Sequence, residues 1–175
     1  GVSSAASDVY KRQFQESGRR VTLYKGVREW FARINAYGAA RGIRILHYIN
    51  SSGLKEIIEG TEIAHEFRKI YACSFLYDVD GIAYWPAVAV NYTNKTQFIF
   101  KINKGVESVF DSKLVNQYIE EDKRPVPFRR MIYVGDGTTD IPCMRLVKNS
   151  GGHSIAVYNP EIRNARRELN GLIRD

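Results

Sequence analysis

The stretch MIYVGDGTTDIPCM occupies residues 131–144, and the interpretation of the rest of the chain starts from it. Residues 131–134 predict a buried strand, residues 135–140 a turn and residues 141–147 a helix. That strand would carry two carboxylates, Asp136 and Asp140, to its carboxyl end, where open α/β sheets bind ligands. Two oxygen donors at this spacing can face one hard cation such as Mg²⁺, although an Asp-Gly turn with Asp140 as the helix N-cap would also explain the pattern.

Helices and strands alternate in the prediction for the rest of the chain. Apolar residues at helical spacing and glycine stops predict helices over residues 27–38, 54–58, 61–69 and 95–103. Short apolar runs predict strands over residues 43–49, 71–77, 82–85 and 154–158, with a tight polar turn at 50–53 and a short helix and loop over 111–130. This alternation implies βαβ units and a mostly parallel sheet in an α/β fold.

Composition indicates a soluble globular protein. Of the 175 residues, 44% are hydrophobic and 26% charged, and the longest mostly apolar stretch, 83–90, is far shorter than the ~20 residues of a membrane helix. The net charge of +7 is scattered and no aromatic residues alternate with the basic ones, so we expect no nucleic-acid partner. Cys73 and Cys143 are too few for a disulfide framework, which favours a reducing compartment, and we expect a cytoplasmic protein.

Both ends of the sequence look unlike the rest. Residues 3–13, SSAASDVYKRQ, resemble the in-frame translation of a transposon adapter used to prepare sequencing libraries, although an ordinary polar tail is the alternative. The helical pattern that reaches residues 172–175 has no C-cap glycine or closing strand after it. We therefore predict that residues 1–13 do not belong to the fold and that residues 14–175 form a partial domain truncated at both ends.

Four stretches together resemble the haloacid dehalogenase (HAD) superfamily. The apolar run followed by GDGxTDxxxM resembles its fourth motif, in particular that of the phosphoserine phosphatase branch. LYKGVREW at 23–30 is similar to the segment before the second motif, INSSG at 49–53 to the second motif itself, and YTNK at 92–95 to the third. The stretches follow the family's order over roughly residues 23–158, and they imply a Rossmann-like three-layer sandwich with a mostly parallel sheet.

The resemblance implies a Mg²⁺-dependent phosphatase that acts on a small phosphorylated substrate through an aspartyl-phosphate. Ser51 and the amides of Ser52 and Gly53 would hold the phosphoryl oxygens, and Lys95 would neutralise the growing charge. Asp136 and Asp140 would anchor the Mg²⁺ ion. Simpler roles stay open, because Ser51 can be a helix cap and two further lysines, Lys101 and Lys104, compete with Lys95 for the role of the cation.

One departure from the family pattern limits what this chain can do. The first motif, DxDx[T/V], supplies the nucleophile and must precede the second motif, but the only DxDG here is Asp78-Val79-Asp80-Gly81, which follows it. We predict that these four residues form a hairpin turn, because Asp and Gly are the residues that such a turn requires. The nucleophile and the first strand of the fold are then missing from this sequence, and the chain alone is expected to be inactive.

Two other classes of protein stay open on the sequence. The first is a nucleotide-binding or receiver-like α/β module without catalysis, which residues 135–140 disfavour because they are acidic where a dinucleotide fingerprint needs three glycines. The second is the phosphorylation domain of a P-type transport ATPase, which carries a similar GDGxND motif. A DxDGT strand upstream would support the hydrolase, and a DKTGT strand after membrane helices would support the pump. The sequence does not indicate the substrate, the cap domain or the oligomeric state.

Overall fold

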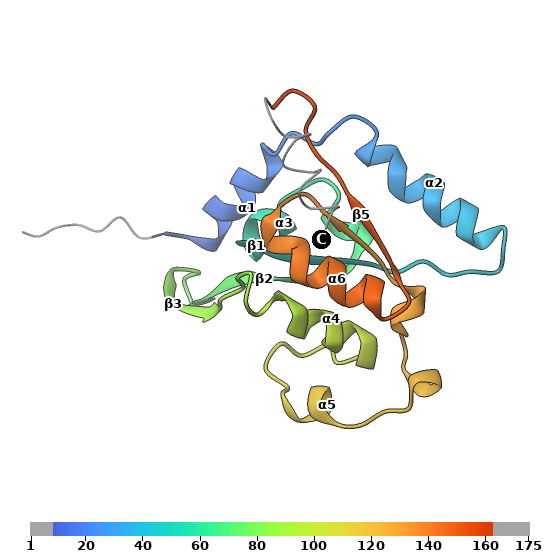
Figure 1. The fold of residues 1–175 in the computed structure, drawn as a ribbon. Helices are drawn as coiled ribbons and strands as arrows, with labels where there is room; N and C mark the ends of the chain where they lie inside the picture. Colours follow the sequence, from blue (N-terminus) through green and yellow to red (C-terminus); the bar gives the residue numbers. More distant parts are fainter. Residues whose placement is uncertain (1–8, 163–175) are drawn as a thin grey trace, which may run out of the picture. The chain divides into compact units, whose positions relative to one another are not determined.

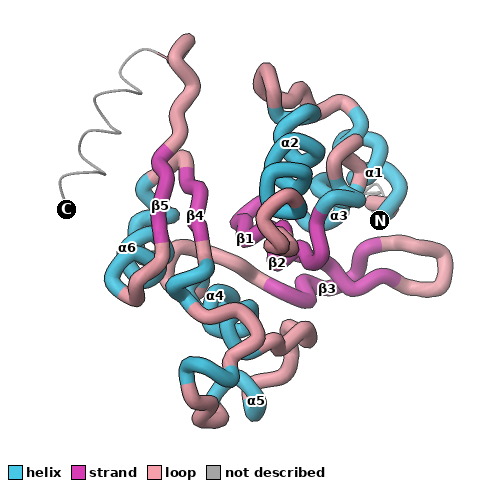
Figure 2. The backbone as a smooth tube through the Cα atoms, turned by 90° about the vertical axis from the view of Figure 1, so that its right-hand side faces the viewer, coloured by secondary structure: helices cyan, strands magenta, loops and turns pink. Residues whose placement is uncertain are grey.

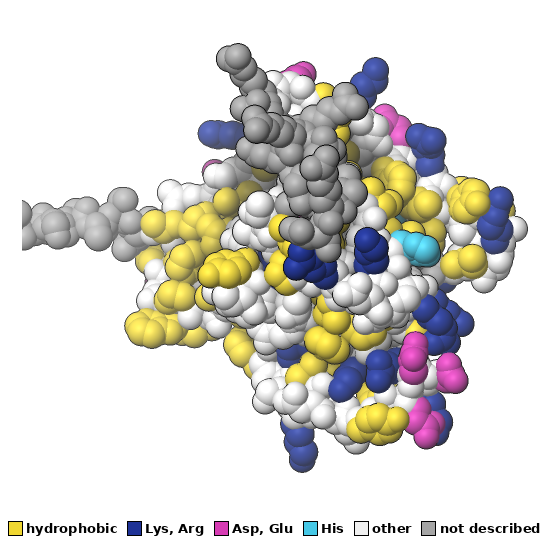
Figure 3. Space-filling view, in the orientation of Figure 1, with side chains coloured by type: hydrophobic (Ala, Val, Ile, Leu, Met, Phe, Trp, Pro, Cys, Tyr) yellow, Lys and Arg dark blue, Asp and Glu magenta, His cyan; other side chains and the backbone are white. Residues whose placement is uncertain are grey.

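The computed structural model describes residues 9–162 and has a mixed α/β fold (Figure 1). The chain divides after Val90 into two compact units, residues 1–90 (unit 1) and 91–175 (unit 2), and each is described by itself. Within residues 9–162, none of the helices is long and apolar enough to cross a membrane. On the face drawn in Figure 3, Lys and Arg side chains are interspersed with hydrophobic and uncharged ones.

Unit 1 contains a three-stranded sheet of order β1-β2-β3. Its strands are β1 (His47–Leu54), β2 (Phe67–Tyr77) and β3 (Ala83–Val88), with β1 and β2 parallel and β2 and β3 antiparallel (Figure 2). The helices of this unit are α1 (Lys11–Arg19), α2 (Val27–Ala39), α3 (Lys55–Glu59) and the short 3-10 helix η1 (Ala64–Glu66).

Aromatic packing holds α2 against this sheet. Phe31, which the helical stripe of α2 predicts to face inward, is 5% exposed. Its ring meets the ring of His47 edge-on at a centroid distance of 5.0 Å and that of Phe67 at 5.4 Å. The helix predicted over residues 27–38 is confirmed, but its apolar stripe is buried only in part: Val27 and Ile34 are half-buried and Trp30 is 48% exposed.

Two glycines let α1 approach α3 closely. A Cβ atom on Gly18 would lie 2.0 Å from the carbonyl oxygen of Ile57, and one on Gly60 would lie 2.0 Å from that of Gln15.

Residues 1–8 lie outside the described part, whereas Lys11 begins α1 and donates its backbone N–H to the carbonyl of Gly81 at 2.9 Å. The origin of residues 1–13 and the predicted domain boundaries stay predictions.

The DVDG segment forms the turn between β2 and β3, as predicted. Asp78 Oδ1 accepts the backbone N–H groups of Asp80 at 2.9 Å and Ile82 at 2.8 Å, and Gly81 has a φ of +80°. A side chain at Gly81 would strain that backbone, so the sequence requirements of the turn explain this DxDG without any catalytic role.

Unit 2 contains a two-stranded parallel sheet, β4 (Ile132–Gly135) and β5 (His153–Ala156), connected by the helix α6 (Ile141–Asn149). Before this sheet come α4 (Lys95–Lys104), α5 (Lys113–Asn116) and two 3-10 helices, η2 (Glu121–Lys123) and η3 (Phe128–Arg130), and η4 (Thr138–Asp140) precedes α6. The buried core of the unit includes Phe98, Ile99 and Ile102 of α4, Phe128, and Cys143 and Val147 of α6.

The lysines that compete with Lys95 support the loop that follows α4. Lys101 is 2% exposed, and its ammonium group donates to the carbonyls of Ser108 and Asp111. Lys104 donates to the carbonyls of Val115 and Gln117, both at 2.6 Å. These contacts give both lysines a structural role.

Several predicted boundaries were wrong. The tight turn expected at 50–53 lies inside β1, which begins only at His47, and the helix expected over 61–69 is replaced by η1 and the start of β2. Pairing of β2 with β1 explains this second error, because residues 67–70 hydrogen-bond to a strand about twenty residues away and local helical spacing carries no information on that partner. The predicted strand at 154–158 lies at His153–Ala156, and the C-terminal helical pattern lies outside the described residues.

The strand expected to be buried at 131–134 is instead largely exposed. Ile132 is 62% exposed and Val134 is 53% exposed. Among the described residues β4 pairs only with β5, and β1 pairs only with β2, so the sheet is divided in two. A small, mostly parallel α/β arrangement is therefore observed, without one continuous sheet.

Candidate functional site

The candidate site lies where β4 ends and α6 begins. Gly135 closes β4, and a Cβ atom placed there would lie 2.7 Å from Asp140 Cβ and 3.1 Å from Met144 Sδ. Only glycine therefore lets the backbone pass this close to the Asp140 side chain without a shift. The turn predicted at 135–140 is confirmed, and it places Asp136 on the surface and Asp140 in the interior.

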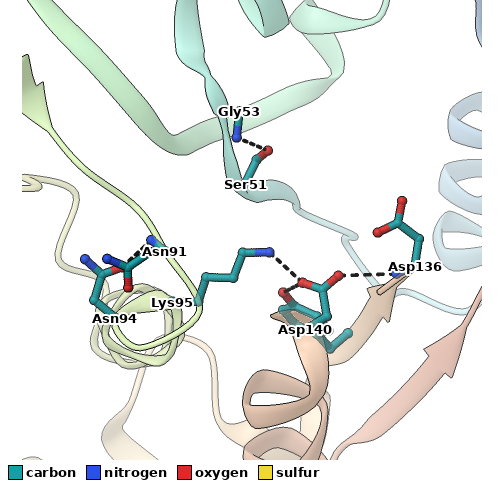
Figure 4. Close-up of polar contacts among 8 residues, drawn as sticks. Ser51, Gly53, Asn91, Asn94, Lys95, Asp136 and Asp140 are labelled. Carbon is teal, nitrogen blue, oxygen red and sulfur yellow. Dashed lines mark hydrogen bonds and ion pairs between the residues drawn. The ribbon is translucent and has the colours of Figure 1, made fainter. Parts of the chain in front are cut away.

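Lys95 forms a buried ion pair with Asp140. Lys95 is the first residue of α4, and its ammonium nitrogen lies 2.7 Å from Asp140 Oδ1 (Figure 4). The two side chains are 6% and 8% exposed, so both charges are removed from water. Moving two charges out of water costs free energy that their attraction only partly returns, so a buried ion pair adds little to the stability of a fold. Its presence here makes Lys95 and Asp140 candidates for a functional role.

Two further donors reach the same carboxylate. The hydroxyl of Tyr133, on β4, donates to Asp140 Oδ1 at 2.7 Å, and the backbone N–H of Asp136 donates to Oδ2 at 3.3 Å. Burial, together with the hydrogen bond to Asp140, raises the pKa of the Tyr133 phenol far above its usual range. Tyr133 therefore stays a protonated donor at any physiological pH.

A role as the N-cap of α6 would be the simplest structural explanation of Asp140, but it does not account for these contacts. Asp140 occupies the N-cap position of α6, but its side chain makes no capping hydrogen bond to that helix. Its oxygens accept from Lys95, Tyr133 and the backbone of Asp136 instead. A carboxylate that serves only as a helix cap would bond to the first turn of the helix.

The donor set suits Mg²⁺ better than a transition metal. In the described part of the chain, no three His, Cys, Asp or Glu residues gather in a way that could hold a metal ion. Mg²⁺ needs no such cage, because it commonly binds one or two carboxylates and keeps several waters and substrate phosphate oxygens as ligands. The exposed carboxylate of Asp136 and the Oδ2 atom of Asp140 are the oxygens that fit this role.

The second-motif residues lie in unit 1. Ser51 is half-buried in β1, and its hydroxyl oxygen accepts the N–H of Gly53 at 3.0 Å, while Ser52 and Gly53 are exposed (Figure 4). The tight turn expected at these residues was wrong, because they belong to an irregular part of β1, whereas the helix expected from residue 54 is observed as α3, which begins at Lys55. Their phosphate-binding role stays a prediction.

The structure thus brings the charged groups of Lys95 and Asp140 together within unit 2, and Asp136 joins them through its backbone N–H. It adds Tyr133, which the sequence analysis treated only as part of an apolar strand. Side chains alternate along a strand, so a Tyr between the exposed Ile132 and Val134 must face the protein interior, and a buried phenol needs a hydrogen-bond acceptor. The sequence alone did not give that signal, because it predicted the whole strand to be buried.

Comparison with known proteins gives one relative and no family. No family model matches the chain. The chain is similar to an uncharacterized protein of Borreliella burgdorferi (strain ATCC 35210 / DSM 4680 / CIP 102532 / B31), with 28% identity over 170 residues. The match covers 86% of this chain but 58% of the relative, so the chain spans a little over half of the relative's length.

Proposed function

We propose that this chain is part of a Mg²⁺-dependent phosphatase of the HAD superfamily that cleaves small phosphomonoesters. The observation that carries the proposal is the buried contact between Lys95 and Asp140, which are 45 residues apart in the sequence. These residues were selected from two separate motifs, and a chance resemblance would not be expected to place their charged atoms in contact. The chemistry of the contact also fits, because a cation beside acidic Mg²⁺ ligands can neutralise a transferring phosphoryl group.

Each retained residue has a defined task in this proposal. Asp136 and Asp140 hold Mg²⁺, which screens the approach of one anion to another when it is bound. Lys95 orients the Asp140 carboxylate and supplies positive charge beside the transferring phosphoryl group. For Ser51, with the amides of Ser52 and Gly53 in unit 1, the proposal keeps the predicted task of binding phosphoryl oxygens.

The nucleophilic aspartate is not among the residues of this chain in the proposal. It belongs to a DxDx[T/V] strand that completes a Rossmann-like three-layer sandwich. The parallel pairs β1–β2 and β4–β5 are compatible with such a sheet, since each pair leaves an edge at which another strand can add. The proposal places the protein in the cytoplasm, in agreement with its cysteine content.

The proposal is tested on the complete protein that contains this chain. Hydrolysis of p-nitrophenyl phosphate is measured with Mg²⁺ and with a chelator for the wild type, Lys95→Gln and Lys148→Gln. Lys148 is an exposed lysine of α6 and is the matched control. Loss of one preorganised charge donor should lower kcat/KM by about 100-fold or more in Lys95→Gln, with little effect in Lys148→Gln. Equal loss in both variants, or hydrolysis that ignores the chelator, would contradict the proposal.

A further inference from the structure

The Asp140 carboxylate has more protein donors than its ion pair requires. Its Oδ1 atom accepts from Lys95 Nζ and from the Tyr133 hydroxyl, both at 2.7 Å. Its Oδ2 atom accepts one longer bond, 3.3 Å, from the backbone N–H of Asp136. The two oxygens of one side chain therefore have different surroundings.

This difference decides which oxygen is available to a ligand. A carboxylate oxygen has about two lone-pair sites, so two short bonds fill Oδ1, whereas Oδ2 keeps one site. Without Tyr133, Oδ1 would have a vacant site, and the plane of the carboxylate would be held by one short bond fewer. The phenol therefore helps to fix the orientation of the carboxylate and the direction in which Oδ2 points.

We propose that Tyr133 is a positioning residue for the metal site, because it occupies Oδ1 of Asp140 and so reserves Oδ2 for the divalent cation or for a water bound to it. This inference rests on the proposed function. Tyr133 acts through Asp140 alone. It differs from Lys95 in that it carries no charge and has no role toward the phosphoryl group.

Metal affinity separates this role from a merely structural one. Without the phenol, the Asp140 carboxylate keeps the Lys95 ammonium group and the N–H of Asp136, but it loses the donor that fixes its orientation. Loss of the phenol is therefore expected to weaken Mg²⁺ binding while unit 2 stays folded.

The test is calorimetric titration with MgCl₂ of the complete protein that contains this chain, for the wild type, Tyr133→Phe and Tyr118→Phe. Tyr118 is 83% exposed and provides the same chemical change on the surface of the same unit. We expect Tyr133→Phe to weaken Mg²⁺ binding by about 10- to 100-fold, as is usual for residues that orient a metal ligand. Tyr118→Phe should match the wild type.

The outcomes distinguish the inference from the function on which it rests. If Asp136→Asn abolishes Mg²⁺ binding and Tyr133→Phe leaves the affinity unchanged, the inference is wrong and the proposed metal site stands. If the complete wild-type protein binds no Mg²⁺, or binds it equally well after Asp136→Asn, the proposed site and the inference are both wrong.

A second measurement needs no variant. Tetranitromethane nitrates exposed phenols that ionise readily, so at mildly alkaline pH it should modify Tyr118 and leave Tyr133 intact, both with and without Mg²⁺. Peptide mass mapping identifies the modified residues. If Mg²⁺ makes Tyr133 reactive, the metal displaces the phenol from Asp140, and the inference is overturned.

Discussion

Replacing Lys95 by Met should destabilise unit 2 strongly. The change removes the ammonium group from a pair whose side chains are 6% and 8% exposed and leaves the Asp140 carboxylate buried. Removing one partner of a buried pair costs about 3–5 kcal/mol, because the remaining charge is uncompensated. Asp140 keeps the hydroxyl of Tyr133 and the N–H of Asp136, so we expect the lower end, about 3 kcal/mol.

The assay must report on unit 2 alone. Both tryptophans, Trp30 and Trp85, lie in unit 1, so tryptophan fluorescence follows that unit only. Hydrogen exchange of the amides of α6 follows unit 2, and a loss of about 3 kcal/mol corresponds to a roughly 150-fold larger opening constant for the slowest of them. The fluorescence transition of unit 1 provides the internal reference in the same sample.

Lys148→Met is the matched control, since Lys148 is exposed and surface substitutions usually change stability by less than about 0.5 kcal/mol. The double variant Lys95→Met with Asp140→Asn should cost less than the sum of the two single variants, because it leaves no buried charge unpaired. If α6 exchanges no faster in Lys95→Met than in Lys148→Met, the buried ion pair does not exist as described.

Three further predictions concern unit 1 and the chain alone. Burial lowers the pKa of His47 below its ordinary value of 6.5. The stability that the neutral imidazole contributes is therefore fully present above pH 6.5 and is lost as the pH falls below it. In His47→Gln, the free energy of unfolding, followed by tryptophan fluorescence, should depend less on pH between about pH 7 and 5.5. Gly18→Ala should lower the free energy of unfolding by about 1–3 kcal/mol despite the better helix propensity of Ala, because the new methyl group would meet the carbonyl of Ile57. Glu16→Ala, on the exposed side of α1, should change it little. Equal unfolding midpoints for the two variants would refute the close approach of α1 and α3. The 175-residue chain should not hydrolyse p-nitrophenyl phosphate, and steady turnover that Asp78→Asn abolishes would show that the DVDG turn is catalytic.

Elements with strong local signals were predicted well from the sequence. The helix α2 and the end of α4 depend on residue spacing and on backbone conformation, and the glycine after α4, Gly105, has a φ of +68°. The turn at 78–81 is equally local, because Asp78 bonds to backbone groups within four residues. Such features need no knowledge of distant parts of the chain.

Errors arose where a distant partner decides the structure. Residues 67–70 became strand because β1 pairs with them. Ile132 and Val134 are exposed because, within the described part of the chain, nothing covers the face of β4 to which they point. An apolar run shows which side chains would be buried if another element packed on that face of the strand. It does not show whether such an element is present.

For the candidate site too, the residues could be predicted from local motifs, but their contacts could not. The positions Lys95, Asp136 and Asp140 could be selected from motifs, and the contact of Lys95 with Asp140 is the part that the structure adds. The distribution of donors over the two oxygens of Asp140 could not be predicted, since it depends on which way Tyr133 points from β4.

The central claim is that the loop after β4 holds Mg²⁺ for phosphoryl transfer. Its most direct test is phosphatase activity of the complete protein against Mg²⁺ concentration for the wild type, Asp136→Asn and Asp80→Asn, the last being an exposed aspartate of the hairpin turn. Asp136 offers the exposed carboxylate of the site, so its loss should remove most activity at limiting Mg²⁺ and move the Mg²⁺ requirement to higher concentration, whereas Asp80→Asn should follow the wild-type curve. Activity of Asp136→Asn equal to that of the wild type at limiting Mg²⁺ would contradict the claim.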